Sequence, residues 1–197
     1  MGRTKEKKRP TALGAAQKER DTILMILAVT FLLGGISGCL LEQKFASGIY
    51  FRRFLEQAVQ DAPIPTWWRA SWTVFRWPVC AVVLSLFPLA GWTLPGLFFL
   101  RGFFLSYGIV AGIEAAGAAG VLWAGIVFGA TCLVTVPIFF ILGTTGLLRK
   151  AHVPESKGTF LRRVMVCLPV LGLCVCAERA ATPRLLHLVL AALSNGG

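Results

Sequence analysis

The sequence predicts an all-α integral membrane protein with about five transmembrane helices. Of its 197 residues, 56% are hydrophobic, whereas soluble domains contain about 45–50% apolar residues. Residues 92–148 form two long apolar runs joined by a short Gly/Ala-rich turn, and each run exceeds the roughly 20 residues that cross a bilayer core. Basic residues gather beside the apolar runs. Because backbone groups in lipid must be satisfied within the segment, these runs are expected to be helices.

The N-terminal 21 residues form a basic tail. It carries seven Lys or Arg residues, which by the positive-inside rule places the N-terminus in the cytoplasm. The formal net charge of the whole chain is +11. Topology and attraction to anionic headgroups explain this charge, so membrane lipids are expected partners and nucleic acid is not.

The first span is expected at about residues 22–41. Gly34 and Gly38 lie four residues apart, on one helix face that lets a neighbouring helix approach closely. A second interpretation stays open, because the residues before Cys39 have the form of a lipoprotein cleavage box, which would make Cys39 a lipidated N-terminus.

Residues 42–70 form the long polar connection, which we place outside. Apolar residues at helical spacing between Ile49 and Val59, among them Phe51, Phe54 and Leu55, predict a short amphipathic helix on the membrane surface. This helix either docks a partner or anchors the loop at the interface. The tryptophans that follow predict an interfacial belt; they are Trp67, Trp68, Trp72 and Trp77.

The second span is expected at about 71–91 and the third at about 94–113, joined by a turn at 90–93. Arg76 lies near the outer end of the second span and is expected to extend toward headgroups. Arg101 lies about two turns into the third span, about 10 Å deep, where an ionisable residue pairs within the bundle, reaches back to the interface or serves transport. The small residues Gly102, Gly108 and Gly112 predict close packing of this helix.

The fourth span is expected at about 121–142, with Gly125 and Gly129 as a further packing face and a kink at Pro137. A basic loop, 149–163, follows. Twelve basic residues fall in the tail and this loop, against six in the 42–70 connection and beyond the last span. This bias favours an N-terminus inside and a C-terminus outside.

The fifth apolar run, about 164–177, is short and ends before Glu178. Pro183 is expected to open a separate amphipathic segment, 183–197, on the outer surface, although a continuation of the span is the alternative. The 22–182 region is therefore the transmembrane domain. The sequence contains no metal-ligand constellation, nucleotide-binding loop or hydrolase motif, so neither catalysis nor a cofactor is expected. Cys174 and Cys176 are expected to be core cysteines.

In the order and spacing of several blocks, the chain resembles the stage II sporulation protein M family. These blocks are the basic tail, the small-residue first span, the Leu97–Leu105 segment that contains Arg101 and Gly102, and the ending from Arg163 through Glu178 to Pro183. The early fourth span departs from the family, since Phe128–Cys132 lacks its polar turn.

The resemblance implies a five-span, non-enzymatic protein of the cell membrane at the sporulation septum. Such a protein anchors and recruits the peptidoglycan-degrading stage II sporulation proteins D and P during engulfment. Arg101, Gly102, Glu178 and Pro183 are the residues that carry over from the family. A homo-oligomer is compatible with the small-residue faces.

Two other classes stay open. A small apolar protein with a basic cytoplasmic face is also typical of the substrate-binding membrane subunit of a vitamin-type uptake transporter, although such a site needs converging polar groups in the bundle. Transmembrane thiol redox chemistry would rest on the six cysteines alone.

Overall fold

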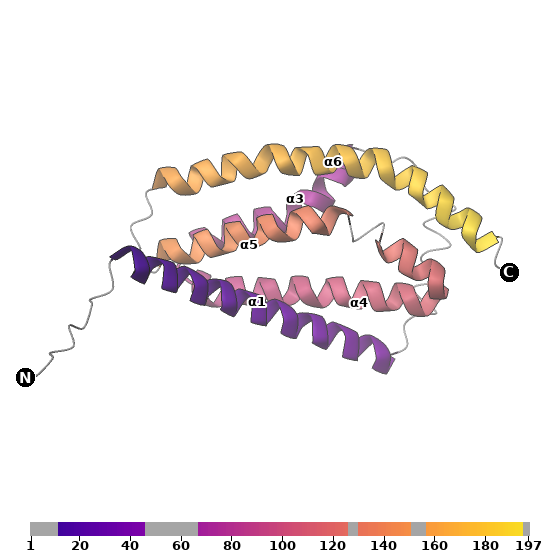
Figure 1. Ribbon diagram of the computed structural model, residues 1–197, viewed down its shortest axis with the longest axis horizontal. Helices are drawn as coiled ribbons and strands as arrows, with labels where there is room; N and C mark the ends of the chain where they lie inside the picture. Colours follow the sequence, from indigo (N-terminus) through magenta and orange to yellow (C-terminus); the bar gives the residue numbers. More distant parts are fainter. Residues whose placement is uncertain (1–11, 46–66, 126–129, 151–156, 195–197) are drawn as a thin grey trace, which may run out of the picture.

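A computed structural model describes residues 12–45, 67–125, 130–150 and 157–194, and within them the chain forms five helices and no strands. The helices are α1 (Ala12–Phe45), α3 (Trp67–Leu86), α4 (Ala90–Ala124), α5 (Ala130–Lys150) and α6 (Lys157–Ser194). They lie along one long axis, and successive helices run in alternate directions (Figure 1). The all-α prediction is confirmed for this part of the chain.

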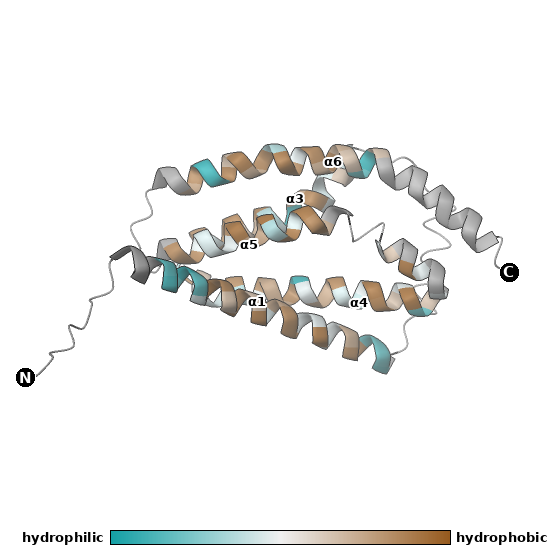
Figure 2. Ribbon diagram, in the orientation of Figure 1, coloured by the Kyte–Doolittle hydropathy of each residue, from teal (hydrophilic) through white to brown (hydrophobic). Residues whose placement is uncertain are grey.

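Three of the helices are long and apolar enough to cross a membrane. These stretches are Gln17–Lys44 in α1, Ala90–Ala115 in α4 and Phe160–Ala180 in α6, and only 17–22% of their most apolar windows is buried inside the protein. The apolar stretches of α3 and α5, Ala70–Leu86 and Cys132–Leu148, are shorter. Hydrophobic residues predominate along the helices, and hydrophilic residues lie near both ends of α1 (Figure 2). Many large hydrophobic side chains are exposed, among them Met25, Leu133 and Leu173. This outward-facing apolar surface is what a lipid environment requires.

Helices α1 and α4 pack in parallel with their backbones in close contact. A Cβ atom at Gly34 would meet the carbonyl oxygen of Phe99, and one at Gly38 would meet that of Phe103. A Cβ at Gly102 would in turn meet the carbonyl oxygen of Phe31. The predicted packing face of the first span is therefore confirmed, and its partner is α4.

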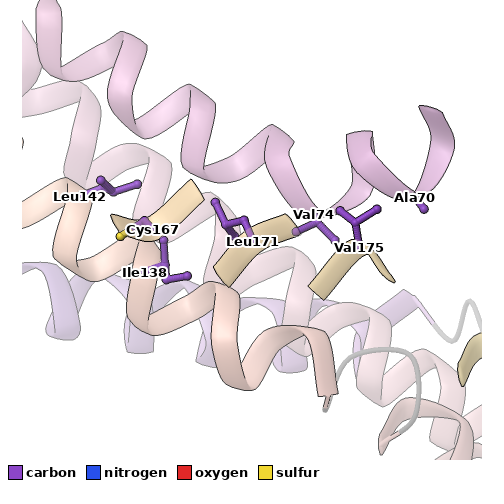
Figure 3. Packing of buried hydrophobic residues seen from close by; sticks show 7 residues of the cluster. All are labelled: Ala70, Val74, Ile138, Leu142, Cys167, Leu171 and Val175. Atoms are coloured by element: carbon purple, nitrogen blue, oxygen red, sulfur yellow. The ribbon is translucent and has the colours of Figure 1, made fainter. Parts of the chain in front are cut away.

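A second packing unit joins α3, α5 and α6. Its buried residues recur every four positions on each helix, which forms one apolar stripe per helix. Figure 3 shows these side chains pointing toward one another; they are Ala70, Val74, Ile138, Leu142, Cys167, Leu171 and Val175. The two units meet where Phe98 of α4 stacks on Phe139 of α5 with ring centroids 4.0 Å apart.

Several predicted boundaries in the first half of the chain were wrong. Helix α1 begins at Ala12, so residues 12–21 of the expected tail belong to the helix. The turn between the second and third spans lies at residues 87–89, and residues 90–93 already belong to α4. Pro88 explains this position, because proline lacks an N–H and favours a turn over a helix interior.

The expected fourth span at 121–142 was also wrong. The chain bends at Gly117, whose φ of 56° and ψ of −127° suit only glycine, and the end of α4 turns back at the right of Figure 1. The next helix is α5, Ala130–Lys150, with Pro137 inside it. Gly125 has nothing within 4 Å of a built Cβ, so it is not a packing position, and Gly129 lies outside the described residues.

Helix α6 corrects the expected C-terminal organisation. It is continuous from Lys157 to Ser194, so the 183–197 segment does not begin as a separate surface helix. The helix continues through residue 194, whereas the stretch long and apolar enough to cross a membrane is Phe160–Ala180. A proline in a helix removes one backbone hydrogen bond, and the continuous helix at Pro183 shows that this loss does not end it.

Candidate functional site

Arg101 is a buried charged residue at which three helices meet. It lies eleven residues after Ala90, the first residue of α4, or about 16 Å along the axis at 1.5 Å per residue. This depth is greater than the expected 10 Å because α4 begins four residues before the predicted span. Its side chain is 9% exposed. An arginine this deep in an apolar helix needs partners inside the protein.

The partners of Arg101 come from the two neighbouring helices. Its Nη2 donates a hydrogen bond of 3.1 Å to Sγ of Cys132 in α5. Its Cζ lies 5.2 Å from the ring centroid of Trp77 in α3, within the range of a cation–π interaction. Phe104, one turn along α4, lies against the same indole with centroids 6.3 Å apart. Arg101 therefore connects α3, α4 and α5.

The contact of Arg101 with Cys132 and Trp77 joins helices. A thiol is a weak hydrogen-bond acceptor, and an indole face attracts a cation without taking a proton from it. The contact therefore fixes the relative positions of three helices, and the expected pairing of Arg101 within the bundle is the one observed.

A second charged group lies between α3 and α6. Arg179 places its Cζ 4.1 Å above the ring of Trp67. Glu178, half-buried beside it, lies within electrostatic range of Arg76, whose own Cζ is 5.6 Å from the Trp77 ring. Glu178 thus belongs to the α3–α6 contact, while Arg101 uses Cys132 and Trp77.

The tryptophan belt is smaller than expected. Trp67, Trp68 and Trp72 are more than half exposed, and the last two stack with centroids 6.3 Å apart. Trp77 instead packs inside the bundle, against Arg101 and against a buried hydrophobic cluster that includes Phe98 and Phe139. Trp77 lies five residues after Trp72, roughly 140° further round the helix at 3.6 residues per turn, so it points to a different face of α3.

The other predicted residues lie in different settings. Gly102 meets α1 at Phe31, whereas Gly112 is approached by Gly120 of the turned-back end of α4. Gly108 is half-buried in α4. Pro183 lies in α6, in a stretch whose side chains are not described. Three further candidates lie outside the described residues: Phe51, Phe54 and Leu55.

Sequence reasoning missed several buried polar residues. Glu42, expected in the outer loop, is fully buried near the end of α1. Thr135, Thr144 and Thr145 of α5 are at most 5% exposed. Helical periodicity gave no signal for the threonines, because Thr135 and Thr144 are nine residues apart and Thr144 and Thr145 are adjacent. The available signal was the presence of hydroxyl side chains within an apolar run.

The cysteines and the possible metal-ligating residues are dispersed within the described ranges. All six cysteines are free, and Cys176 is exposed whereas Cys174 is partly buried. No group of three or more His, Cys, Asp or Glu residues suited to a metal ion occurs in the described ranges. Cys39 is half-buried in α1, directly after Gly38.

No protein-family model matches the chain, and comparison with curated proteins and with solved structures found no match.

Proposed function

We propose that this protein is a non-enzymatic membrane scaffold that recruits peptidoglycan-degrading partners during septum remodelling and engulfment. In this proposal the chain crosses the cell membrane five times, with its N-terminus in the cytoplasm and its C-terminus outside. The segment between α1 and α3 then faces the cell wall, where it docks the degrading enzymes, stage II sporulation proteins D and P.

The use of Arg101 is the observation that carries the scaffold proposal. A residue that transports a substrate or proton must exchange partners, whereas Arg101 bridges Cys132 and Trp77 and so ties three helices together. The glycine contacts between α1 and α4 tie in a fourth. A tightly packed bundle is a rigid platform, and rigid elements position a docking segment better than mobile ones.

Two further observations support the proposal. Successive helices run in alternate directions, and the start of α1 and the end of α6 lie at opposite ends of the bundle (Figure 1), as an odd number of crossings requires. The blocks that resemble the sporulation family, from Leu97–Leu105 to Pro183, provide the identity of the partners.

The test is partner recovery from native membranes. The chain carries a C-terminal tag, is crosslinked gently and is purified, and the co-purifying proteins are identified by mass spectrometry. The triple variant Phe51→Ser, Phe54→Ser, Leu55→Ser is compared with Gln57→Ser and Gln60→Ser, polar substitutions in the same segment. We expect peptidoglycan hydrolases with the parent chain and the control, and their loss with the triple variant. Undiminished recovery with the triple variant would contradict docking by this segment.

A substrate-binding subunit of a small-molecule uptake system is the second candidate. The observation in its favour is the convergence of Arg101, Cys132 and Trp77 inside the bundle, because such a system needs polar groups that meet within the spans. Recovery of an ATP-binding-cassette module in the same crosslinking experiment would favour this candidate over the scaffold.

A further inference from the structure

A basic cavity opens between α1, α5 and α6, at the end of the bundle where α1 and α6 begin and α5 ends. Its volume is about 490 Å³. Three of its lining residues are arginines, Arg20, Arg162 and Arg163, and none is acidic. Such a concentration of positive charge in a hollow attracts an anion.

One wall of the cavity is built to hold an arginine in place. Arg163 donates from Nη1 to Oγ1 of Thr145 at 2.9 Å, and that hydroxyl donates to the carbonyl oxygen of Ile141 at 2.6 Å. Thr145 is only 1% exposed. A guanidinium anchored in this way loses less conformational freedom when it binds a second group.

Thr144 is an independent observation that points to a ligand in the cavity. Its side chain is 4% exposed and lines the same cavity, yet its hydroxyl has no hydrogen-bond partner within the described residues. Burying a hydroxyl without a partner costs about 1–3 kcal/mol. A ligand oxygen in the cavity would remove this cost.

The level of the cavity favours a lipid as the source of that oxygen. Arg20 and Arg162 each lie in the first turn of a candidate span, Gln17–Lys44 and Phe160–Ala180. This is the level at which headgroups meet the apolar layer. The remaining walls include Leu24, Phe140 and Val166, which suit the start of an acyl chain.

From these observations we infer that the cavity binds the phosphate of an anionic phospholipid, with the guanidinium groups and the Thr144 hydroxyl donating to its oxygens. Guanidinium groups match phosphate oxygens in geometry as well as charge. Basic pockets between membrane helices recognise anionic headgroups in this way. The inference does not depend on the proposed scaffold function.

The experiment titrates the purified full chain, freed of lipid in an uncharged detergent, with short-chain phosphatidylglycerol, short-chain phosphatidylcholine or inorganic phosphate. Bound ligand is counted by native mass spectrometry. We expect phosphatidylglycerol to bind at least about tenfold more tightly than phosphatidylcholine, since each basic residue contributes about 1 kcal/mol toward an anionic lipid.

Two matched pairs of variants separate the cavity from general surface charge. Arg162→Gln is compared with Lys18→Gln, because Lys18 lies at the same end of the bundle but lines a different hollow. Thr144→Val is compared with Thr135→Val, a second buried hydroxyl of α5 without a partner. We expect Arg162→Gln and Thr144→Val each to weaken phosphatidylglycerol binding by about fivefold to tenfold, and the controls to leave it unchanged.

Equal binding by all four variants would overturn the inference, because the lipid would then be held by general charge. Binding of inorganic phosphate without binding of phosphatidylglycerol would overturn the lipid assignment. Displacement of phosphatidylglycerol by inorganic phosphate would support recognition of the phosphate group itself.

Discussion

Replacing Gly34 by alanine tests the close contact of α1 and α4. A Cβ at this position would lie 2.8 Å from the carbonyl carbon of Phe99, and ordinary contact begins at 3.4 Å. The two helices must therefore separate by at least 0.6 Å at this point. The atoms to be displaced belong to the backbone, so no side-chain rotation can relieve the overlap.

The magnitude follows from two opposing effects. Overpacking of this kind costs about 1–3 kcal/mol, whereas alanine in place of glycine in a helix gains about 1 kcal/mol. The control is Gly172→Ala in α6, where a built Cβ meets nothing within 4 Å, so only the gain applies. We expect Gly34→Ala to be less stable than Gly172→Ala by about 1–3 kcal/mol.

The assay measures unfolding of the purified variants in detergent. Unfolding is monitored by tryptophan fluorescence or by the loss of monodisperse protein on heating. Each variant is compared with the parent chain in the same detergent, so that differences in micelle composition cancel. Equal stability of the two alanine variants would refute the backbone contact between α1 and α4.

Three other substitutions test separate parts of the structure. Arg101→Ala removes a side chain that is 91% buried and leaves a cavity, so we expect the free energy of unfolding to fall by about 2–4 kcal/mol. Arg101→Met fills the space and removes a charge from the apolar layer, so we expect the free energy of unfolding to change by at most about 1 kcal/mol. Equal thermal stability of the two variants would contradict a packing role. Thr135→Val should raise the unfolding temperature, because the buried Thr135 hydroxyl has no partner within the described residues. The free energy of unfolding should rise by about 1 kcal/mol. A lower unfolding temperature would show that the hydroxyl is hydrogen-bonded. Gly117→Ala should destabilise the protein by about 1–2 kcal/mol in the same assay, because the backbone at Gly117 has φ of 56°. An unchanged unfolding temperature would mean that stability does not require the bend.

Most of the apolar helices and the packing face of the first could be predicted from local sequence, whereas the helix that packs on that face could not. Apolar runs longer than a bilayer core and the four-residue spacing of Gly34 and Gly38 depend on residues close together in the chain, and both patterns correspond to observed helices and packing. The bend at Gly117 could not be placed, because Gly and Ala are frequent throughout residues 111–120 and any of those glycines fits a bend. As a result, the next helix was expected to begin at about residue 121, whereas it begins at Ala130.

The surroundings of the candidate site could not be predicted from sequence. Arg101 meets Trp77 from 24 residues earlier and Cys132 from 31 residues later, and nothing local links these three positions. Trp77 was grouped with the exposed tryptophans because it follows them closely in sequence. The basic cavity likewise forms only when α1, α5 and α6 bring their arginines together.

Topology is the measurement that tests the scaffold most directly. Short epitope tags are placed at the N-terminus, between residues 46 and 66, between residues 151 and 156, and at the C-terminus, and each tagged chain is probed in intact and opened cells. The scaffold predicts that the 46–66 and C-terminal tags are accessible from outside, and that the other two become accessible only after opening. A 46–66 tag on the same side as the N-terminus would contradict it, because the docking segment could not then reach the cell wall.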